Sequence, residues 1–392
     1  MQNRIIADQI ITPFYSISRG MVVINPEGII KKVTSIDIPS KKTEKDLILE
    51  GMTLIPGFID IHTHGGYGVM FGEGDFETDT EKYSLWAAGN GVTGFLLSIT
   101  GPNPEAIKKT ILDYVKLFTS KSSWPGAVPL GLHLEGPFLN PDKHGAFDPG
   151  WLHVPSVSEI AQYLEIGGDW IKQVSLAPEL EGAEEAAEFL STAGVTVAMA
   201  HSNADYETAR NALIGPFSHV THTFNAQSSL HHRAPGVIGA ILASDGITGE
   251  LIGDGIHVHP AVMKILFRCI GAERVVLITD AMPGAGLPDG KYQLMGREVT
   301  VENGKATLPD GTIAGSAATM RSCVETTVNK SNVPLPDAVR AASYNPALVI
   351  RESDRVGSIE TGKEANFTVL DNKFNIFMTI VKGKIVYKRK GS

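Results

Sequence analysis

The sequence predicts an α/β protein: a (β/α)8 TIM barrel with a small β-sandwich domain built from the N- and C-terminal segments. Eight short apolar runs rich in β-branched residues occur between residues 57 and 281. Patterns typical of amphipathic helices separate most of these runs, as expected for parallel strands joined by crossover helices. The two ends of the chain contain only short strand-like runs with turn residues between them.

The terminal segments are predicted to form one small domain together. Residues 1–55 alternate between apolar runs and turns, with a turn signal at Asn25-Pro26-Glu27-Gly28, and residues 352–392 carry a hairpin signal at Lys382-Gly383-Lys384. Each segment is too short to bury a good hydrophobic core alone. Because the termini of a domain often lie close together, we expect the two segments to pair, which leaves residues 56–351 for the barrel.

The strands of the barrel are predicted in order along the chain. They cover residues 57–64, 91–98, 129–136, 171–179, 195–202, 219–225, 249–257 and 274–281. Helical patterns occupy residues 77–89, 103–118, 156–167, 181–193, 204–213, 259–270, 317–329 and 335–348. Eight strands with intervening helices favour a closed barrel over an open sheet. The long segment 283–316 after the eighth strand has its own hairpin-like run, and insertions of this kind usually cover an active site.

The composition excludes several classes of protein. With 34 Lys and Arg against 43 Asp and Glu, the formal net charge is −9, so we expect neither nucleic-acid nor membrane partners. Two cysteines, Cys269 and Cys323, provide neither a disulfide framework nor a thiolate zinc site. The N-terminus lacks the pattern of a signal peptide, and no apolar run is long enough to span a membrane. We expect a soluble cytoplasmic protein.

Ionisable side chains gather at the predicted strand ends. All twelve histidines lie between residues 62 and 259. In a (β/α)8 barrel the catalytic residues come from the carboxyl ends of the strands. Six of the eight predicted strands end in side chains able to bind a metal, namely His62 and His64, Glu135, His201, His222, His257 and Asp280. Histidines and carboxylates without thiolates suit a catalytic Zn²⁺, Fe²⁺ or Mn²⁺ centre.

Strand alternation refines the choice of ligands. Residues two apart share a face of a strand, so His62 and His64 point the same way. His219 and His222 are three apart, so we expect only one of them to face inward and favour His222, which is nearer the strand end. His133 lies one layer deeper than the predicted ligands, where it either supports a ligand or is a core histidine.

Asp280 has the placement of a general base. A catalytic metal lowers the pKa of bound water to about 7, which makes hydroxide available as a nucleophile at neutral pH. A carboxylate beside that water can accept its proton and then deliver it to a leaving amine. The alternative is that Asp280 is an ordinary metal ligand, and the two roles are compatible if its contact with the metal is weak or runs through water.

Several motifs resemble a known family. GFIDIHTHG (57–65), which follows the β-rich N-terminus, is similar to the signature of the amidohydrolase superfamily. Further motifs resemble its N-acetylglucosamine-6-phosphate deacetylase family, namely HLEGPF (133–138), AHS (200–202), THTFNA (221–226), HHRAPG (231–236), DGIH (254–257) and LITDAM (277–282). This resemblance extends essentially from end to end. It implies hydrolysis of the acetamide of N-acetyl-D-glucosamine 6-phosphate to D-glucosamine 6-phosphate and acetate, a step of amino sugar metabolism.

The resemblance also implies a set of metal ligands. Glu135, His201 and His222 would hold the main ion. Because the chain keeps His62 and His64, we expect a second ion bridged by Glu135, which gives one or two divalent ions per subunit, Zn²⁺ or Fe²⁺. In many relatives a carboxylated lysine bridges the two metals, but the fourth strand of this chain ends in LAPE and offers no lysine there.

The remaining implied roles concern proton transfer and the substrate. Asp280 would be the proton shuttle, and Arg233 would bind the 6-phosphate, either within its own subunit or from the second subunit of a homodimer as in family dimers. Arginine suits phosphate because its planar fork matches two oxygens, although a solvated loop is the alternative for His231-His232-Arg233. Many relatives carry Glu where this chain has Ala234. The sugar and acetamide would be contacted by Ala146, Asn225, Ala226, His257, Ile313, Ala314 and Gly315.

Other polar residues in the histidine-rich window are interpreted as structural. We expect His144 and His153 to lie in a surface loop, His259 to begin a helix, and Asp60 to support the site without binding metal.

Two competing functions remain open at this point. One is another amidohydrolase activity, such as that of an N-acyl amino acid deacylase or a cyclic amide hydrolase, for which Arg233 would matter little. The other is a non-catalytic binding homologue, which would not need Glu135, His201, His222 and Asp280 together.

Overall fold

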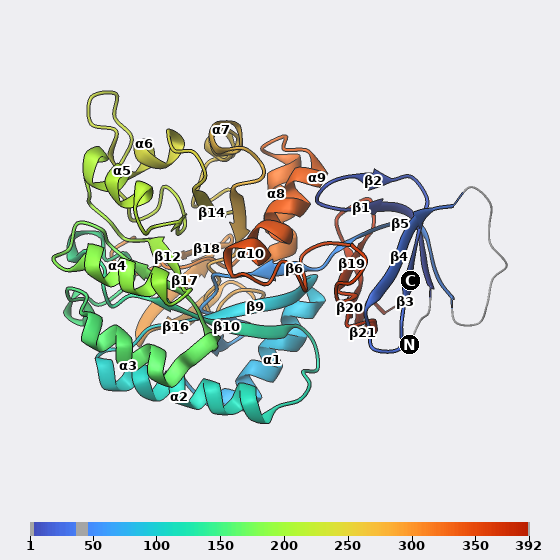
Figure 1. Ribbon diagram of the computed structural model, residues 1–392, viewed down its shortest axis with the longest axis horizontal. Coiled ribbons are helices and arrows are strands. Elements are labelled where there is room, and N and C mark those ends of the chain that lie inside the picture. The colour runs from blue at the N-terminus through green and yellow to red at the C-terminus, as the bar shows by residue number, and fades with distance from the viewer. Residues whose placement is uncertain (1–3, 37–45, 391–392) are drawn as a thin grey trace.

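Two large sheets organise the protein in the computed structural model, which describes residues 4–36 and 46–390 (Figure 1). One sheet forms a barrel surrounded by helices, and the other projects from one side of the barrel. The described helices include none with the length and apolar content needed to cross a bilayer.

The barrel consists of eight parallel strands that are neighbours in chain order. They are β6 (Phe58–Asp60), β9 (Val92–Ile99), β10 (Val128–Glu135), β11 (Ile171–Leu176), β12 (Thr196–Met199), β13 (His219–Val220), β14 (Thr248–Ile252) and β15 (Val275–Ile278). Each predicted strand overlaps one of them, so the predicted (β/α)8 architecture is confirmed.

The first and last strands are joined just beyond their carboxyl ends. The amide of Asp280 donates to the carbonyl of His62 at 2.9 Å, and the amide of His64 donates to the carbonyl of Ala281 at 2.9 Å. The Thr279 hydroxyl also donates to Asp60 at 2.6 Å. The barrel therefore closes at the level where the predicted site residues lie, and Asp60 has the supporting role expected of it.

Ten α-helices belong to the described part of the chain. They are α1 (Phe76–Gly89), α2 (Pro104–Ser120), α3 (Val157–Gly167), α4 (Ala183–Thr192), α5 (Tyr206–Ile214), α6 (Gly236–Leu242), α7 (Pro260–Ile270), α8 (Met320–Asn329), α9 (Leu335–Ala342) and α10 (Tyr344–Val349). The sequence patterns missed α6, because its residues 236–241 are all buried and show no polar face. They also predicted one helix over 335–348, which the structure divides at Ser343 into α9 and α10. His259 caps α7 as predicted, since its ring accepts from the amide of Ala261.

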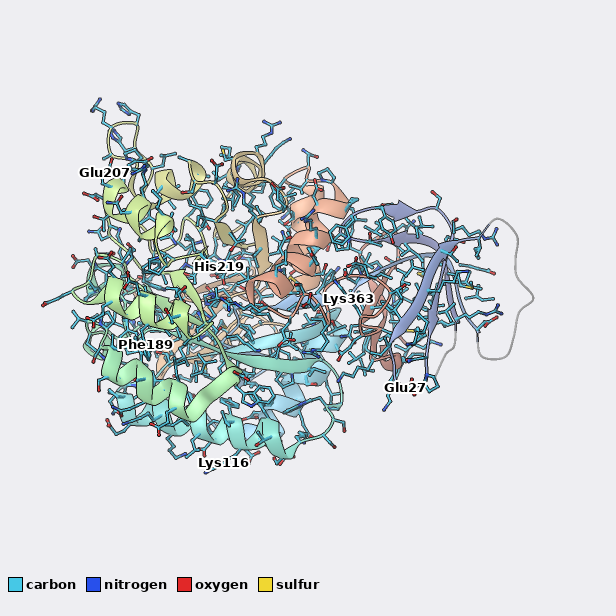
Figure 2. All side chains as sticks on the ribbon, viewed as in Figure 1. Glu27, Lys116, Phe189, Glu207, His219 and Lys363 are labelled. Atoms are coloured by element: carbon cyan, nitrogen blue, oxygen red, sulfur yellow. The ribbon has the colours of Figure 1, made fainter. Side chains whose placement is uncertain are left out.

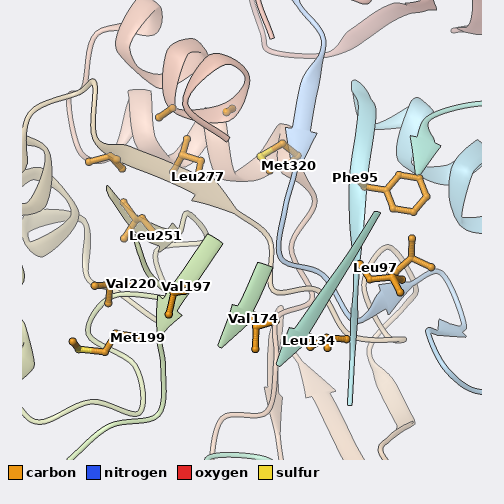
Figure 3. Packing of buried hydrophobic residues seen from close by; sticks show 14 of the residues in the cluster. Phe95, Leu97, Leu134, Val174, Val197, Met199, Val220, Leu251, Leu277 and Met320 are labelled. Carbon is orange, nitrogen blue, oxygen red and sulfur yellow. The ribbon is translucent and has the colours of Figure 1, made fainter. Parts of the chain in front are cut away.

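Apolar side chains pack on both faces of the barrel strands. Outward-facing residues such as Leu97, Val174 and Leu251 pack against the helices in one large hydrophobic cluster (Figure 3). Inward-facing residues near the amino ends of the strands, among them Ile59 and Val276, form a separate apolar cluster. The barrel interior also holds buried polar side chains, among them Gln173, His219 and Glu250 within the strands and others at the carboxyl ends.

The terminal sheet joins both ends of the chain. Its order is β21-β20-β19-β5-β1-β3-β4, with β2 paired to β1. The strands are β1 (Arg4–Ile11), β2 (Ser16–Ile17), β3 (Gly20–Ile24), β4 (Ile30–Ser35), β5 (Asp46–Pro56), β19 (Phe367–Leu370), β20 (Ile376–Val381) and β21 (Lys384–Lys388). β5 is parallel to β1 and antiparallel to β19.

The pairing of the two terminal segments is thus as predicted. Side chains of both segments, for example Ile5, Leu54 and Phe367, share one hydrophobic cluster. Residues 1–3, 37–45 and 391–392 of the predicted small domain lie outside the described residues.

The insertion after β15 forms a small antiparallel sheet of β16 (Gly290–Leu294), β17 (Arg297–Glu302) and β18 (Lys305–Thr307). Arg297 donates to the carbonyl of Ala146 at 3.0 Å. This contact ties the insertion to the loop that follows β10.

Candidate metal centre

Four histidines surround the carboxylate of Glu135 at the carboxyl end of the barrel. Its Oε2 lies 2.8 Å from Nε2 of His64 and 3.3 Å from Nε2 of His62. Its Oε1 lies 3.1 Å from Nε2 of His222 and 3.4 Å from Nε2 of His201. The two oxygens of one carboxylate therefore face two different pairs of imidazoles.

Asp280 lies at the edge of this cluster. Its Oδ1 is 3.7 Å from Nε2 of His62 and 3.6 Å from Nε2 of His64. The Asp280 side chain is 13% exposed, whereas that of Glu135 is 2% exposed. Asp280 thus stands between the buried ligand set and the solvent-accessible space above it.

The donor atoms fit a divalent cation. Nε2 of His201 and Nε2 of His222 lie 3.2 Å apart, although two neutral imidazoles that both present a lone pair would repel each other. Nε2 of His62 is buried and makes no hydrogen bond of acceptable geometry, despite its closeness to Glu135. A cation between these atoms would satisfy all of them, which accounts for their close approach.

The ring orientations leave Nε2 available in two of the histidines. Nδ1 of His62 lies 2.7 Å from Oε2 of Glu250, and Nδ1 of His201 lies 2.7 Å from the carbonyl of Lys143. Because both partners are acceptors, Nδ1 must carry the proton in each ring. The Nε2 lone pairs are then directed towards Glu135, as metal ligation requires.

The electrostatics of the cluster favour positive charge. Burial by itself lowers the pKa of His62, but the charges of Glu135 and Glu250 outweigh it, so the pKa lies well above its usual value. Burial would also raise the pKa of Glu135, yet the charge of His62 and the close contacts of His201 and His222 bring it well below its ordinary value. A centre that stabilises carboxylates and imidazolium in this way will also attract a metal cation.

Three of the residues predicted to bind metal or move protons have left-handed backbone conformations. The φ angle is +42° at His201, +23° at His222 and +49° at Asp280. For residues other than glycine such angles cost about 1–3 kcal/mol each and concentrate at functional sites. Here they turn the chain sharply at the ends of β12, β13 and β15.

The prediction that only one of His219 and His222 faces the interior is wrong. His219 is fully buried, and its Nε2 lies 3.0 Å from Oε1 of Glu250, in the middle of the barrel (Figure 2). Alternation fails because β13 contains only His219 and Val220. Beyond it the backbone leaves the strand conformation, so both histidines reach the interior.

Sequence reasoning also missed Glu250. This residue is fully buried inside β14 and contacts both His62 and His219. An ionisable residue within the apolar run GELIG was a signal, since a lone buried carboxylate requires partners. His133 bonds to Ser98 and Ser175 and packs edge-on against His62, so it both supports a ligand and fills the core.

A cavity of about 460 Å³ opens above the metal centre. Its lining includes the predicted residues Ala146, Asn225, Ala226, His257, Ile313 and Gly315, together with Leu294 and Met295 from the insertion. The expectation that the insertion covers the site is confirmed. Ala314 is buried in a hydrophobic cluster beside the cavity and does not line it.

Two further histidines contact the cavity or its surroundings. Nδ1 of His257 lies 2.7 Å from Asp254, which orients its ring. His144 lines the cavity, with Nδ1 3.1 Å from the carbonyl of Phe147, and so does not lie on the outer surface as expected. His153 is half-buried and pairs with Glu159 away from the cavity.

Arg233 is exposed and does not line the cavity of its own chain. It sits in a tight turn closed by hydrogen bonds between His231 and Ala234. Its Nη1 lies 2.7 Å from Nε2 of His232. The basic cluster therefore occupies a surface loop between β13 and α6.

Comparison with known proteins places this site in a family. The model of the amidohydrolase family matches residues 53–386. N-acetylglucosamine-6-phosphate deacetylase of Bacillus subtilis is 36% identical over 97% of this chain and 96% of its own length. N-acetylgalactosamine-6-phosphate deacetylase of Escherichia coli O157:H7 is 34% identical over 92% of this chain and 93% of its own.

Solved structures agree with these relatives. A mutant of N-acetyl-D-glucosamine-6-phosphate deacetylase from Mycobacterium smegmatis, in complex with N-acetyl-D-glucosamine 6-phosphate, superposes with a TM-score of 0.92 at 30% identity. The superposition covers 98% of this chain and 99% of the Mycobacterium smegmatis chain. Enamidase, at 14% identity and a TM-score of 0.65, shares the fold alone.

Proposed function

The chain belongs to the amidohydrolase family, and we propose that it hydrolyses the acetamide of N-acetyl-D-glucosamine 6-phosphate to D-glucosamine 6-phosphate and acetate. Relatives that match it over nearly their whole length are deacetylases of hexosamine 6-phosphates. The observation that carries the proposal is Glu135, whose two oxygens face two pairs of histidines beneath a cavity. Neither another amide substrate nor a non-catalytic role is favoured.

We propose that Glu135, His201 and His222 hold one divalent ion and that His62 and His64 share Glu135 to hold a second. Zn²⁺ and Fe²⁺ suit these nitrogen and oxygen donors. When bound, such an ion acts as a Lewis acid, which polarises a carbonyl group and lowers the pKa of a water molecule to about 7.

Asp280 moves the proton. Its carboxylate accepts a proton from the attacking water as the new C–O bond forms at the acetamide carbon. The same carboxyl then donates that proton to the sugar nitrogen as the C–N bond breaks, so acetate and a free amine result. Its partial exposure and its position in the lining of the cavity support this role.

The sugar binds in the cavity above the metal centre. His257, held by Asp254, presents its Nε2 to the substrate, and Asn225 and Ala226 line the same space. Ala146, Ile313 and Gly315 complete the walls.

The 6-phosphate requires a cation, and we propose that Arg233 provides it from the second subunit of a homodimer. Arg233 does not line its own cavity, and the turn that carries it is exposed and free to reach a neighbouring molecule. A bidentate contact between its guanidinium and the phosphate would bind the substrate more tightly than the unphosphorylated sugar.

Two expectations about the whole chain stand beside this function. We propose that residues 1–55 and 352–392 form a separate small domain and that residues 56–351 form the catalytic barrel. We also propose a cytoplasmic location, which the two free cysteines, Cys269 and Cys323, support.

The test measures acetate released by the metal-loaded enzyme. The substrates are N-acetylglucosamine 6-phosphate, its galactosamine epimer and unphosphorylated N-acetylglucosamine. We expect the glucosamine phosphate to react fastest. Failure to release acetate from either phosphorylated sugar would refute the proposed function, and equal rates with and without phosphate would refute phosphate recognition.

A further inference from the structure

A fully buried carboxylate lies directly beneath the candidate metal centre. Glu250 of β14 receives four hydrogen bonds. Its Oε2 lies 2.7 Å from Nδ1 of His62 and accepts from the backbone amide of His222 at 3.1 Å. Its Oε1 lies 3.0 Å from Nε2 of His219 and accepts from Nε2 of Gln173 at 3.1 Å. Each carboxylate oxygen of Glu250 thus has two hydrogen-bond partners.

We propose that Glu250 is the positioning residue of the metal centre and sets the affinity of the half formed by His62 and His64. The proposal rests on the metal centre of the proposed function. Glu250 does not contact the cavity, and it acts on the ion only through His62 and the backbone of His222.

The first part of the argument concerns the tautomer of His62. A neutral imidazole carries one proton, and only the nitrogen without it can bind a metal. Since Glu250 accepts the proton of Nδ1, Nε2 is the ligand nitrogen, and it is the one that faces Glu135. A charge-assisted bond of this kind also fixes the plane of the ring and makes the imidazole a better ligand.

The second part concerns the backbone of His222. This residue has a φ angle of +23°, which is unfavourable for a residue other than glycine. The bond from its amide to Glu250 helps to hold that conformation. One carboxylate therefore restrains a ligand in each half of the centre, but it touches the imidazole itself only at His62.

The third part concerns what holds Glu250. Gln173 donates its amide nitrogen to Glu250, while the amide oxygen of Gln173 is buried without a hydrogen-bond partner. His219 is anchored in turn by Thr248, whose hydroxyl lies 2.7 Å from its Nδ1. Gln173 and His219 both bind Oε1, so His219 alone can keep Oε2 directed towards His62 when Gln173 is replaced.

The experiment compares Glu250→Gln with Gln173→Met as a matched control. Glutamine keeps the size of Glu250 but presents amide hydrogens or a weaker acceptor to Nδ1 of His62, whereas Gln173→Met leaves the Glu250 to His62 bond in place. Purified full-length enzymes are stripped of metal and titrated with Zn²⁺ against a chromophoric chelator, and bound zinc is counted by mass spectrometry.

We expect Glu250→Gln to lower the affinity for the ion at His62 and His64 about 10–100-fold, because the loss of such supporting bonds has this effect in other metal sites. The affinity for the other ion should fall much less. Gln173→Met should bind both ions nearly as the wild type does. The thermal midpoint of the metal-free proteins is measured in parallel. If Glu250→Gln lowers that midpoint but leaves both affinities unchanged, Glu250 is merely structural and the proposal is wrong.

A crystal structure of the zinc-loaded wild type covers the case in which Glu250→Gln does not fold. The proposal requires zinc on Nε2 of His62 while Nδ1 remains hydrogen-bonded to Glu250. Zinc on Nδ1, or no zinc at His62, overturns it. All these measurements omit the sugar substrate, so a wild-type enzyme that binds two ions but releases no acetate would refute the proposed function and leave this inference intact.

Discussion

The backbone amide of Asp280 donates a hydrogen bond to the carbonyl of His62 over 2.9 Å. The residue proposed to shuttle protons is therefore fixed by the main chain to a residue proposed to bind metal. Because this bond also joins the ends of β15 and β6, the closure of the barrel and the geometry of the site depend on the same contact.

Replacing Asp280 with Asn should reduce kcat by about 10²–10⁴-fold, the usual contribution of a positioned acid or base. The amide cannot accept the proton of water at neutral pH, but it has nearly the same shape. Acetate release under saturating substrate measures the loss, and zinc content serves as the control. A variant that keeps its metal and remains active would show that Asp280 is not the shuttle.

Removing the metal should abolish activity and lower thermal stability. Ligands that bind only the native state stabilise it, by about 2.7 kcal/mol for each site when the free metal is at a hundred times its Kd. Chelation followed by calorimetry with and without added Zn²⁺ measures this. In Glu135→Gln, where both halves of the centre lose their shared carboxylate, added metal should restore little stability. Full restoration in that variant would contradict the proposed ligand set.

Arg233→Ala should raise KM for the phosphorylated sugar and leave the slow reaction of the unphosphorylated sugar unchanged. The loss of a charge-assisted contact to phosphate corresponds to about 1.5–3 kcal/mol, or roughly 10–150-fold in KM. Steady-state kinetics on both sugars separate this effect from general damage to the site. Equal losses on both would mean that Arg233 is structural.

Mixing Arg233→Ala, which is slow at substrate concentrations far below its raised KM, with Asp280→Asn, which is slow at any concentration, tests which subunit uses Arg233. In a mixed dimer of Arg233→Ala and Asp280→Asn, one site combines an intact Asp280 with an intact Arg233 from the other subunit. Activity should therefore reappear after the subunits are exchanged. If Arg233 acts within its own chain, no site in the mixture is complete, and activity stays at the level of the separate variants.

Asp254 should contribute stability that depends on pH. Burial by itself would raise its pKa, but the hydrogen bond and charge of His257 outweigh burial, so the pKa lies below its ordinary value. A lowered carboxyl pKa stabilises the fold above the ordinary value of about 3.9, and this contribution is lost as the pH falls through the lowered pKa.

Replacing Asp254 with Asn should therefore cost about 1.5–3 kcal/mol at pH 7, the range for hydrogen bonds to charged groups. The difference from the wild type should shrink once the pH drops below about 4. Urea unfolding at a series of pH values measures it. A difference that stays constant down to the acid end would mean that the Asp254 charge plays no part.

The (β/α)8 barrel could be predicted from the sequence. Along most of the barrel, the periodicity of hydrophobic residues and the polar residues at strand ends indicate the same strands. The sequence also predicted that Glu135, His201 and Asp280 lie at one end of the barrel, as they do in the structure, because each of them ends or closely follows a strand of at least four residues. It failed at His219, since alternation needs a strand longer than the two residues of β13. It missed Glu250 because the partners of that carboxylate come from three other strand regions, and only the fold brings them together.

The position of Arg233 shows a different limit of prediction from the sequence. Its residue type and loop predict a phosphate contact, yet its distance from the cavity of its own chain depends on how the loop before α6 leaves the barrel. No local pattern in HHRAPG specifies that direction.

The place of β5 between β1 and β19 has a consequence for biosynthesis. β5 ends at Pro56, whereas β19 begins at Phe367. At typical rates of translation, roughly 15–60 s pass before the second neighbour of β5 has been made. During that time one edge of β5 is unpaired and open to association with other chains. The terminal sheet is therefore completed last, after the entire barrel has left the ribosome.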